Sequence, residues 1–198
     1  MGKIIFTSQR VDIIKDYNER RDALDQKCAR FLWETGCISF PVPNHANSAN
    51  FLLHNYTPAG ILLTGGNNPV PYNGDAPERD EVDSLLIQYA VSNKIPLAGV
   101  CRGMQSLVLY FGGTLKKVKG HIAVKHQING EITREVNSYH SLSADSIPRE
   151  FTVLAHSGDG EIESIRHNTL PITGIMWHPE RDDPFSKLDI ELFKSIFA

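Results

Sequence analysis

A cysteine stands between two glycines in the run Gly99-Val100-Cys101-Arg102-Gly103. An apolar, strand-like segment (95–100) precedes the cysteine, and an apolar pattern with helical spacing (104–111) follows it. The sulfur is therefore predicted at a sharp strand-to-helix turn, the geometry of a nucleophile elbow. Glycines suit this turn because the two backbones leave no room for a Cβ. Since a helix N-terminus favours thiolate over thiol, Cys101 is a candidate nucleophile.

A base for this nucleophile is offered by His178-Pro179-Glu180, which follows the apolar segment 174–177. A catalytic cysteine needs a base to take its proton and a third group to orient that base. His178 and Glu180 would share one face of an extended segment, so Cys101, His178 and Glu180 form a candidate triad. Two alternatives stay open: Cys101 is a buried structural residue of an ordinary turn, or His140 is the base.

A double glycine, Gly65-Gly66, ends the strand-like segment 60–64. Taken alone it indicates only a turn. Beside a nucleophile elbow, its backbone N–H groups become candidates for an oxyanion hole. The second donor would be the N–H of Arg102, the residue after the nucleophile.

The order of apolar segments indicates an α/β fold with a mainly parallel, doubly wound sheet. Strands are expected at 3–7, 37–42, 60–64 and 95–100, alternating with helices at 19–35, 51–56, 77–92 and 104–111. The second half adds a hairpin turning at Asn129-Gly130, between 124–128 and 131–136. Further strands at 151–156, 162–166 and 172–177 precede a closing helix at 188–197. One domain, 1–198, is expected, with its site at the carboxyl ends of the strands.

Composition narrows the function classes. The 198 residues carry a net charge of −3, which gives no general attraction to nucleic acid or to an anionic membrane. We find no apolar run of membrane-spanning length and no signal sequence, so a cytoplasmic protein is expected. Three cysteines argue against a disulfide framework. His121 and His126 are close in sequence, but no carboxylate cluster joins them, so neither a metal nor a cofactor is expected.

Several motifs together resemble the class I glutamine amidotransferase superfamily, most closely its peptidase C26 branch, the γ-glutamyl hydrolases. The resemblance implies a flavodoxin-like fold, the triad named above, and an oxyanion hole from Gly66 and Arg102. It also implies that Gly65, Gln105 and the stretch Asn137-Ser138-Tyr139-His140 bind the glutamyl group. The motifs occur in the family's order: Thr64-Gly65-Gly66, Arg79-Asp80, the elbow with Met104-Gln105, Gly112-Gly113-Thr114-Leu115, Asn137 to His140, Asp159-Gly160 with Glu161 and Glu163, and Trp177 to Glu180.

The chemistry expected from this resemblance is hydrolysis of a γ-glutamyl amide through a thioester on Cys101. The N-terminal stretch looks like a compact bacterial sub-branch linked to capsule pathways, which includes γ-glutamyl-CDP-amidate hydrolases. Arg10, Arg20 and Arg21 are expected at the rim of the site, where guanidinium groups would suit a nucleotide-linked, anionic leaving group. One alternative is a glutaminase subunit that serves a separate synthetase. Another is a non-catalytic binding homologue.

Overall fold

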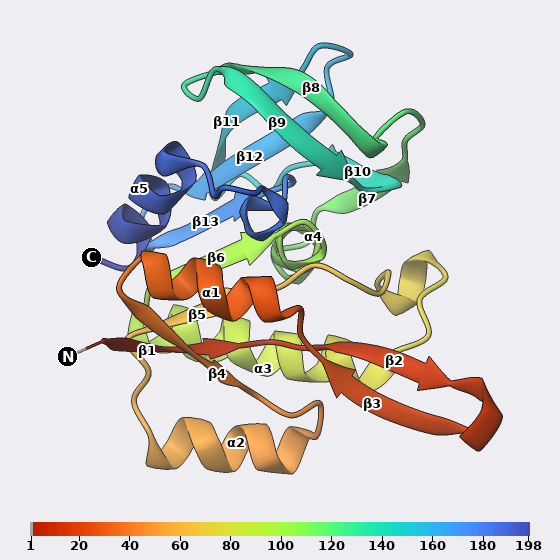
Figure 1. Ribbon diagram of the computed structural model, residues 1–198, viewed down its shortest axis with the longest axis vertical. Helices are drawn as coiled ribbons and strands as arrows, with labels where there is room; N and C mark the ends of the chain where they lie inside the picture. The colour runs from red at the N-terminus through yellow and green to blue at the C-terminus, as the bar shows by residue number, and fades with distance from the viewer. Residues whose placement is uncertain (1) are drawn as a thin grey trace.

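The computed structural model describes residues 2–198, which build one mixed nine-stranded sheet flanked by helices (Figure 1). Its first five strands run parallel, as expected for the doubly wound half, and the remaining strands pair antiparallel. The α/β fold is thus confirmed. The strand order is β4 (Cys37–Pro41), β1 (Lys3–Thr7), β5 (Gly60–Leu63), β6 (Leu97–Val100), β13 (Ile172–Ile175), β12 (Ile162–His167), β11 (Phe151–Ser157), β8 (Ile122–Gly130) and β9 (Arg134–Tyr139).

Two cores lie on the two faces of this sheet. One is packed by α1 (Gln26–Glu34) and α5 (Lys187–Ile196), which bury Phe31 and Phe193 against each other edge to face. The other lies under α2 (Ala46–Asn55), α3 (Pro77–Asn93) and α4 (Arg102–Tyr110). The central strands β5 and β6 are buried along their whole length, which explains their continuously apolar sequences. Their carboxyl ends are held rigidly between the two cores.

The helix expected over 19–35 is wrong in its first part. Residues 19–23 form β3 (Glu19–Ala23), which pairs antiparallel with β2 (Arg10–Ile14) around the short 3-10 turn η1 (Lys15–Tyr17). This arm projects from the body of the molecule (Figure 1). Asp12 lies opposite Arg21 across the two strands, whereas the ion pairs of the arm join residues of the same strand, Arg10 with Asp12 and Arg21 with Glu19. The helix begins only after Asp25, whose carboxylate caps it.

The hairpin in the second half exists, but its turn is not at Asn129-Gly130. Both residues belong to β8, and the reversal occurs at 131–133. Gly130 is needed for another reason: a Cβ there would overlap the backbone of Leu154 in the neighbouring β11. β7 (Thr114–Lys117) and β10 (Leu142–Ser146) pair as a separate two-stranded ribbon. The sequence does not predict these strands, because their apolar patterns are too short.

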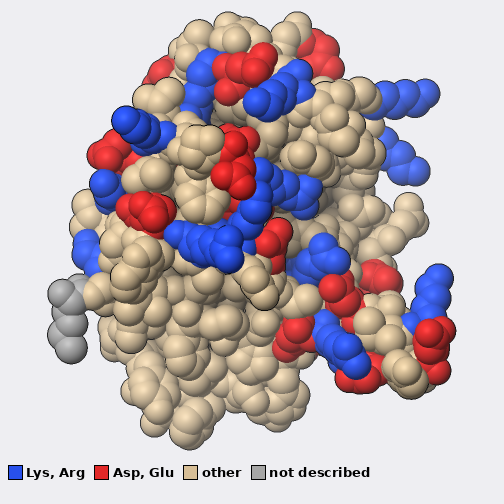
Figure 2. Space-filling model, viewed as in Figure 1, with Lys and Arg blue, Asp and Glu red and all other residues tan. Residues whose placement is uncertain are grey.

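Acidic and basic side chains are interleaved on the face seen in Figure 2, including along the β2–β3 arm. This face therefore carries no large patch of one charge. Among residues 2–198, no helix is both long enough and apolar enough to cross a membrane. The three cysteines are free thiols, all of them buried.

Candidate active site

Cys101 lies in the turn between β6 and α4, with φ 51° and ψ −103°. This backbone conformation is rare for a residue with a side chain and costs on the order of 1–3 kcal/mol, a feature typical of nucleophile elbows. The neighbouring glycines permit the turn. A Cβ on Gly99 would lie 2.7 Å from the carbonyl carbon of Gly103, and one on Gly103 would overlap the backbone of Leu63. The steric reason for the two glycines is therefore confirmed.

His178 approaches Glu180 at the end of β13. Its Nδ1 is 2.6 Å from Glu180 Oε1, so Nε2 is the ring nitrogen that remains available to a second partner. From the sequence, an extended segment is expected after His178. The structure instead has the 3-10 turn η3 (Pro179–Arg181) there. The contact survives because a single tight turn also folds Glu180 back toward the imidazole.

The protonation state of His178 follows from its neighbours. Burial by itself lowers the pKa of His178, because it disfavours the imidazolium. The charges of Cys101 and Glu180, together with a side-chain hydrogen bond to each of them, outweigh burial and raise the pKa to about 10. The imidazole therefore holds a proton at neutral pH, 2.6 Å from the Glu180 carboxylate and stabilised by the charge of Cys101. His140 does not occupy this position.

The double-glycine turn packs directly on the His178 ring. A Cβ on Gly65 would lie 2.5 Å from His178 Cε1, so a side chain cannot be placed there without movement. Gly66 has a φ of 129°, and a Cβ there would strike the side chain of Arg10. Arg79, fully buried, donates to the carbonyl oxygens of Thr64 at 2.7 Å and Gly65 at 2.9 Å. This guanidinium fixes the turn, a role that the sequence motif alone does not reveal.

The backbone N–H of Arg102 opens α4, where the first N–H groups have no partner within the helix. Its side chain points the other way. The guanidinium is buried against Asp80 and Asp83 and donates to Ser106 Oγ at 2.8 Å. Burial lowers the pKa of Arg102 to about 9, and the nearby Arg79 charge acts in the same direction. The ion pair anchors the start of α4, immediately after Cys101.

The Asn137 side chain makes two hydrogen bonds to the backbone of His178. It donates from Nδ2 to the carbonyl oxygen of His178 at 2.8 Å, and its Oδ1 accepts from the N–H of the same residue at 2.9 Å. Tyr139 lies edge-on to the imidazole with a ring separation of 5.7 Å. In the same buried layer, Ser138 Oγ donates to the His121 carbonyl and Gln105 Nε2 donates to the Leu142 carbonyl. Contact of these residues with a glutamyl group stays a prediction.

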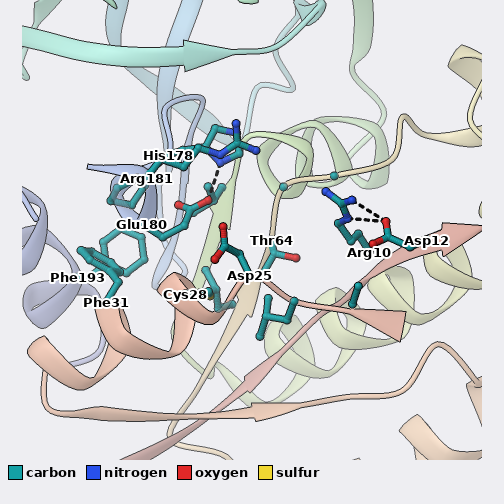
Figure 3. Close-up of a pocket in the computed structure, with 17 residues that line it drawn as sticks. Arg10, Asp12, Asp25, Cys28, Phe31, Thr64, His178, Glu180, Arg181 and Phe193 are labelled. Carbon is teal, nitrogen blue, oxygen red and sulfur yellow. Dashed lines mark hydrogen bonds and ion pairs between the residues drawn. The ribbon is translucent and has the colours of Figure 1, made fainter. Parts of the chain in front are cut away.

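A cavity of about 300 Å³ opens beside this cluster (Figure 3). Gly65, Gly66, His178 and Glu180 are among the residues that line it. Arg10, paired with Asp12, also lines it and lies apart from His178 and Glu180 in Figure 3. Apolar side chains form its floor. The remaining lining residues are Ala23, Leu24, Asp25, Cys28, Phe31, Leu62, Thr64, Val100, Pro179, Arg181 and Phe193.

The three arginines of the N-terminal arm have different positions. Arg10 reaches the cavity, as expected. Arg20 is not among the residues that line it: its Nε donates to Glu78 Oε1 at 2.7 Å, at the start of α3. Arg21 is exposed and pairs with Glu19. Arg181, for which the sequence gives no signal, also lines the cavity and lies over the Tyr139 ring at 4.1 Å.

One expectation about histidines is wrong. A carboxylate does join His121 and His126: it comes from Glu163, 42 residues beyond His121 (163 − 121), on another strand of the same sheet. The three side chains offer ligand atoms within 4.8 Å of one another. Sequence spacing could not reveal this, because β12 supplies the carboxylate and β8 one of the imidazoles.

Comparison with known structures agrees with the topology. The fold superposes on a putative GMP synthase subunit of Thermoplasma acidophilum with a TM-score of 0.77, covering 100% of this chain and 93% of that one at 19% identity. A glutamine amidotransferase of Thermotoga maritima gives a TM-score of 0.68 at 17% identity, over 98% and 84% of the two chains.

Sequence relatives extend over much of the chain. The γ-glutamyl-CDP-amidate hydrolase of Campylobacter jejuni is 26% identical over 186 residues, 92% of each protein. Component 2 of anthranilate synthase from Thermococcus kodakarensis is 34% identical over 138 residues, 65% of this chain and 68% of that one. The family model for class-I glutamine amidotransferases matches residues 20–186. The chain therefore belongs to the class-I glutamine amidotransferase family, and its chemistry is hydrolysis of γ-glutamyl amides.

Proposed function

We propose that this protein hydrolyses a γ-glutamyl amide whose leaving group is an anionic, nucleotide-linked phosphoramidate, through a thioester on Cys101. The observations that support it best are the strained backbone of Cys101 at a strand-to-helix turn and the buried His178, which is paired to Glu180 and whose pKa the Cys101 charge raises. This arrangement supplies a nucleophile, an acid–base group and an orienting carboxylate in one cluster.

The chemical steps follow from the positions of these groups. The Cys101 thiolate attacks the γ-carbonyl carbon, and the oxyanion forms beside the N–H groups of Gly66 and Arg102, each lowering the barrier by a few kcal/mol. His178 then gives its proton to the leaving nitrogen as the C–N bond breaks. The γ-glutamyl thioester remains. His178 next takes a proton from water, the resulting hydroxide opens the thioester, and glutamate leaves with the thiolate restored.

The cavity beside His178 supports the choice of leaving group. Arg10 is half-exposed, and among the described residues its side chain pairs only with Asp12. A surface pair of this kind is worth about 0–1 kcal/mol, so an anionic ligand can displace Asp12 at little cost. Arg181 makes no ion pair with any of residues 2–198. Two guanidinium groups at one cavity suit phosphate oxygens, which they bind in a bidentate manner. The likeness to a γ-glutamyl-CDP-amidate hydrolase, over 92% of each protein, supports the same class of substrate.

Glutamate release from γ-glutamyl-CDP-amidate and from L-glutamine tests the proposal. The phosphoramidate should be preferred, and Cys101→Ala should abolish turnover of both. Arg10→Ala should lower kcat/KM for the phosphoramidate by about 10–100-fold, the value of a charged hydrogen bond, and leave L-glutamine unaffected. Arg149→Ala, at a side chain 94% exposed, is the control. Equal efficiency on both substrates would refute the leaving group but not the thiol chemistry.

A second function is favoured by the synthase subunits among the relatives: delivery of ammonia from glutamine to a separate synthetase. In that case L-glutamine is the preferred substrate, Arg10→Ala has no effect, and a synthetase partner increases the rate of glutamine hydrolysis. The same pair of assays therefore separates the two functions.

A further inference from the structure

Behind the candidate active site, three imidazoles and one carboxylate meet. His126 lies in β8 and Glu163 in β12, while His121 and His140 stand at the adjoining ends of the β8–β9 hairpin. Glu163 Oε1 is 3.5 Å from His121 Nδ1, 3.3 Å from His126 Nε2 and 3.3 Å from His140 Nε2. His121 Nδ1 and His140 Nε2 are 3.3 Å apart. No step proposed above uses this cluster.

The hydrogen bonds of His121 and His140 determine which of their ring nitrogens carries a hydrogen and which faces Glu163. His121 Nε2 is 2.9 Å from Asp159 Oδ2, which as a carboxylate can only accept, so this nitrogen carries a hydrogen. His140 Nδ1 is 3.1 Å from the Leu142 carbonyl oxygen and must donate as well. In the neutral tautomers, His121 Nδ1 and His140 Nε2 are therefore lone-pair nitrogens. Together with Glu163 Oε1, three acceptors face one point, an arrangement that repels unless a cation lies between them.

Two atoms at the centre also lack partners. Glu163 is fully buried, and its Oε2 has no hydrogen-bond partner among residues 2–198. His126 Nε2 is likewise buried and unpartnered within that range, despite its approach to Glu163. Leaving a carboxylate buried without compensation is costly, so a buried charge is normally paired or bound to a metal.

We propose that His121, His126, His140 and Glu163 bind one divalent transition-metal ion of the zinc class. Tetrahedral Zn²⁺ with bonds of about 2.0–2.1 Å places its ligand atoms about 3.3 Å apart. Four of the six distances in such a tetrahedron are given above and, at 3.3–3.5 Å, match this edge. The ligand atoms of His121 and His126 lie within 4.8 Å of each other, so His126 moves inward when the ion binds. Imidazole and carboxylate are suitable donors for such an ion. Asp159 and the Leu142 carbonyl hold the outer nitrogens, as outer partners do in known zinc sites.

The site would be structural. It would join β8 and the end of β9 to β12, and β12 pairs with β13, which leads to His178. Next to His140 stands Tyr139, whose ring lies against the His178 imidazole. A bound ion would thus fix the residues that back the catalytic histidine, without taking part in the reaction.

Metal content of the full chain tests this inference independently of the proposed function. All measurements use the Cys101→Ala background, because a catalytic thiol beside His178 competes for Zn²⁺. After dialysis against Zn²⁺ and then metal-free buffer, one ion per chain is expected by elemental analysis. Co²⁺ in its place should give the intense visible absorption of a tetrahedral site. Zn²⁺ should raise the melting temperature.

The matched variants identify the ligands. His126→Gln is the first choice, because this side chain is 18% exposed whereas those of His121 and His140 are buried, so its replacement disturbs the core least. It should weaken Zn²⁺ binding by more than the roughly 10–100-fold typical of outer-sphere changes, which Asp159→Asn should show. His54→Ala, at an exposed histidine on α2, should bind as the parent does. Circular dichroism confirms that each variant is folded.

Two results would overturn the inference. One is a folded parent that retains less than a stoichiometric amount of Zn²⁺ and shows no change in melting temperature. The other is unchanged binding in His126→Gln. In the first case the cluster is held together by a proton on one imidazole, and nuclear magnetic resonance of the histidine rings would then show an imidazolium beside Glu163.

Discussion

The substitution Gly65→Ala tests whether the double-glycine turn sets the position of the His178 imidazole, the proposed acid–base group. The added methyl would lie 2.5 Å from His178 Cε1 and 3.3 Å from Nδ1. Carbon atoms in favourable contact are about 3.5–4.0 Å apart, so one of the two groups must move by roughly 1 Å. Arg79 holds the turn through two carbonyl oxygens, so most of the displacement falls on the imidazole ring.

A displacement of about 1 Å in a reacting group costs about 10²-fold in rate, or about 2.7 kcal/mol of barrier. We therefore expect kcat for glutamate release to fall by about two orders of magnitude in Gly65→Ala. Alkylation of Cys101 by iodoacetamide should slow as well, because the thiolate loses its imidazolium partner. This second readout separates a displaced His178 from a methyl group that merely obstructs the substrate.

Gly158→Ala is the matched control, since a Cβ at that glycine meets nothing within 4 Å. Its turnover and melting temperature should equal those of the parent. If Gly65→Ala keeps kcat within about twofold and the alkylation rate is unchanged, the turn does not position His178 and the reasoning fails.

Three further predictions concern the same region. Asn137→Ala removes two hydrogen bonds to the His178 peptide, worth about 1 kcal/mol each, so kcat should fall by about 30-fold with little change in KM; an effect on KM alone would contradict a positioning role. The raised pKa of His178 stabilises the fold fully below its ordinary value of 6.5, and this contribution is lost as pH rises toward about 10. Melting temperatures should therefore decline over that range in the parent and decline less in Cys101→Ala. Phe31→Ala should lower the free energy of unfolding by about 3–5 kcal/mol in chemical denaturation, whereas Trp33→Ala, 70% exposed on the same helix, should change it by less than about 0.5 kcal/mol.

The parts of the molecule that sequence predicts well are those governed by local periodicity. The buried strands β5 and β6 and the helix α4 follow from continuous apolar runs and a helical pattern broken by glycines. The position of Cys101 at a strand-to-helix turn follows in the same way. The helix expected over 19–35 is wrong at 19–23, because these residues pair with the strand at 10–14 and form a hairpin that their own pattern does not reveal. The turn expected at Gly130 is wrong because that glycine serves a close contact with β11.

For the candidate site, residue types and order in the sequence were enough to single out Cys101, His178 and Glu180. The tertiary structure decided how they are supported. Arg79 holds the double-glycine turn, Asn137 holds the His178 peptide, and neither contact joins neighbours in sequence. The same holds for Glu163, which enters the histidine cluster from another strand. Local pattern thus determines which element a residue occupies, whereas long-range strand pairing determines which side chains meet, because partners in a sheet can lie any distance apart along the chain.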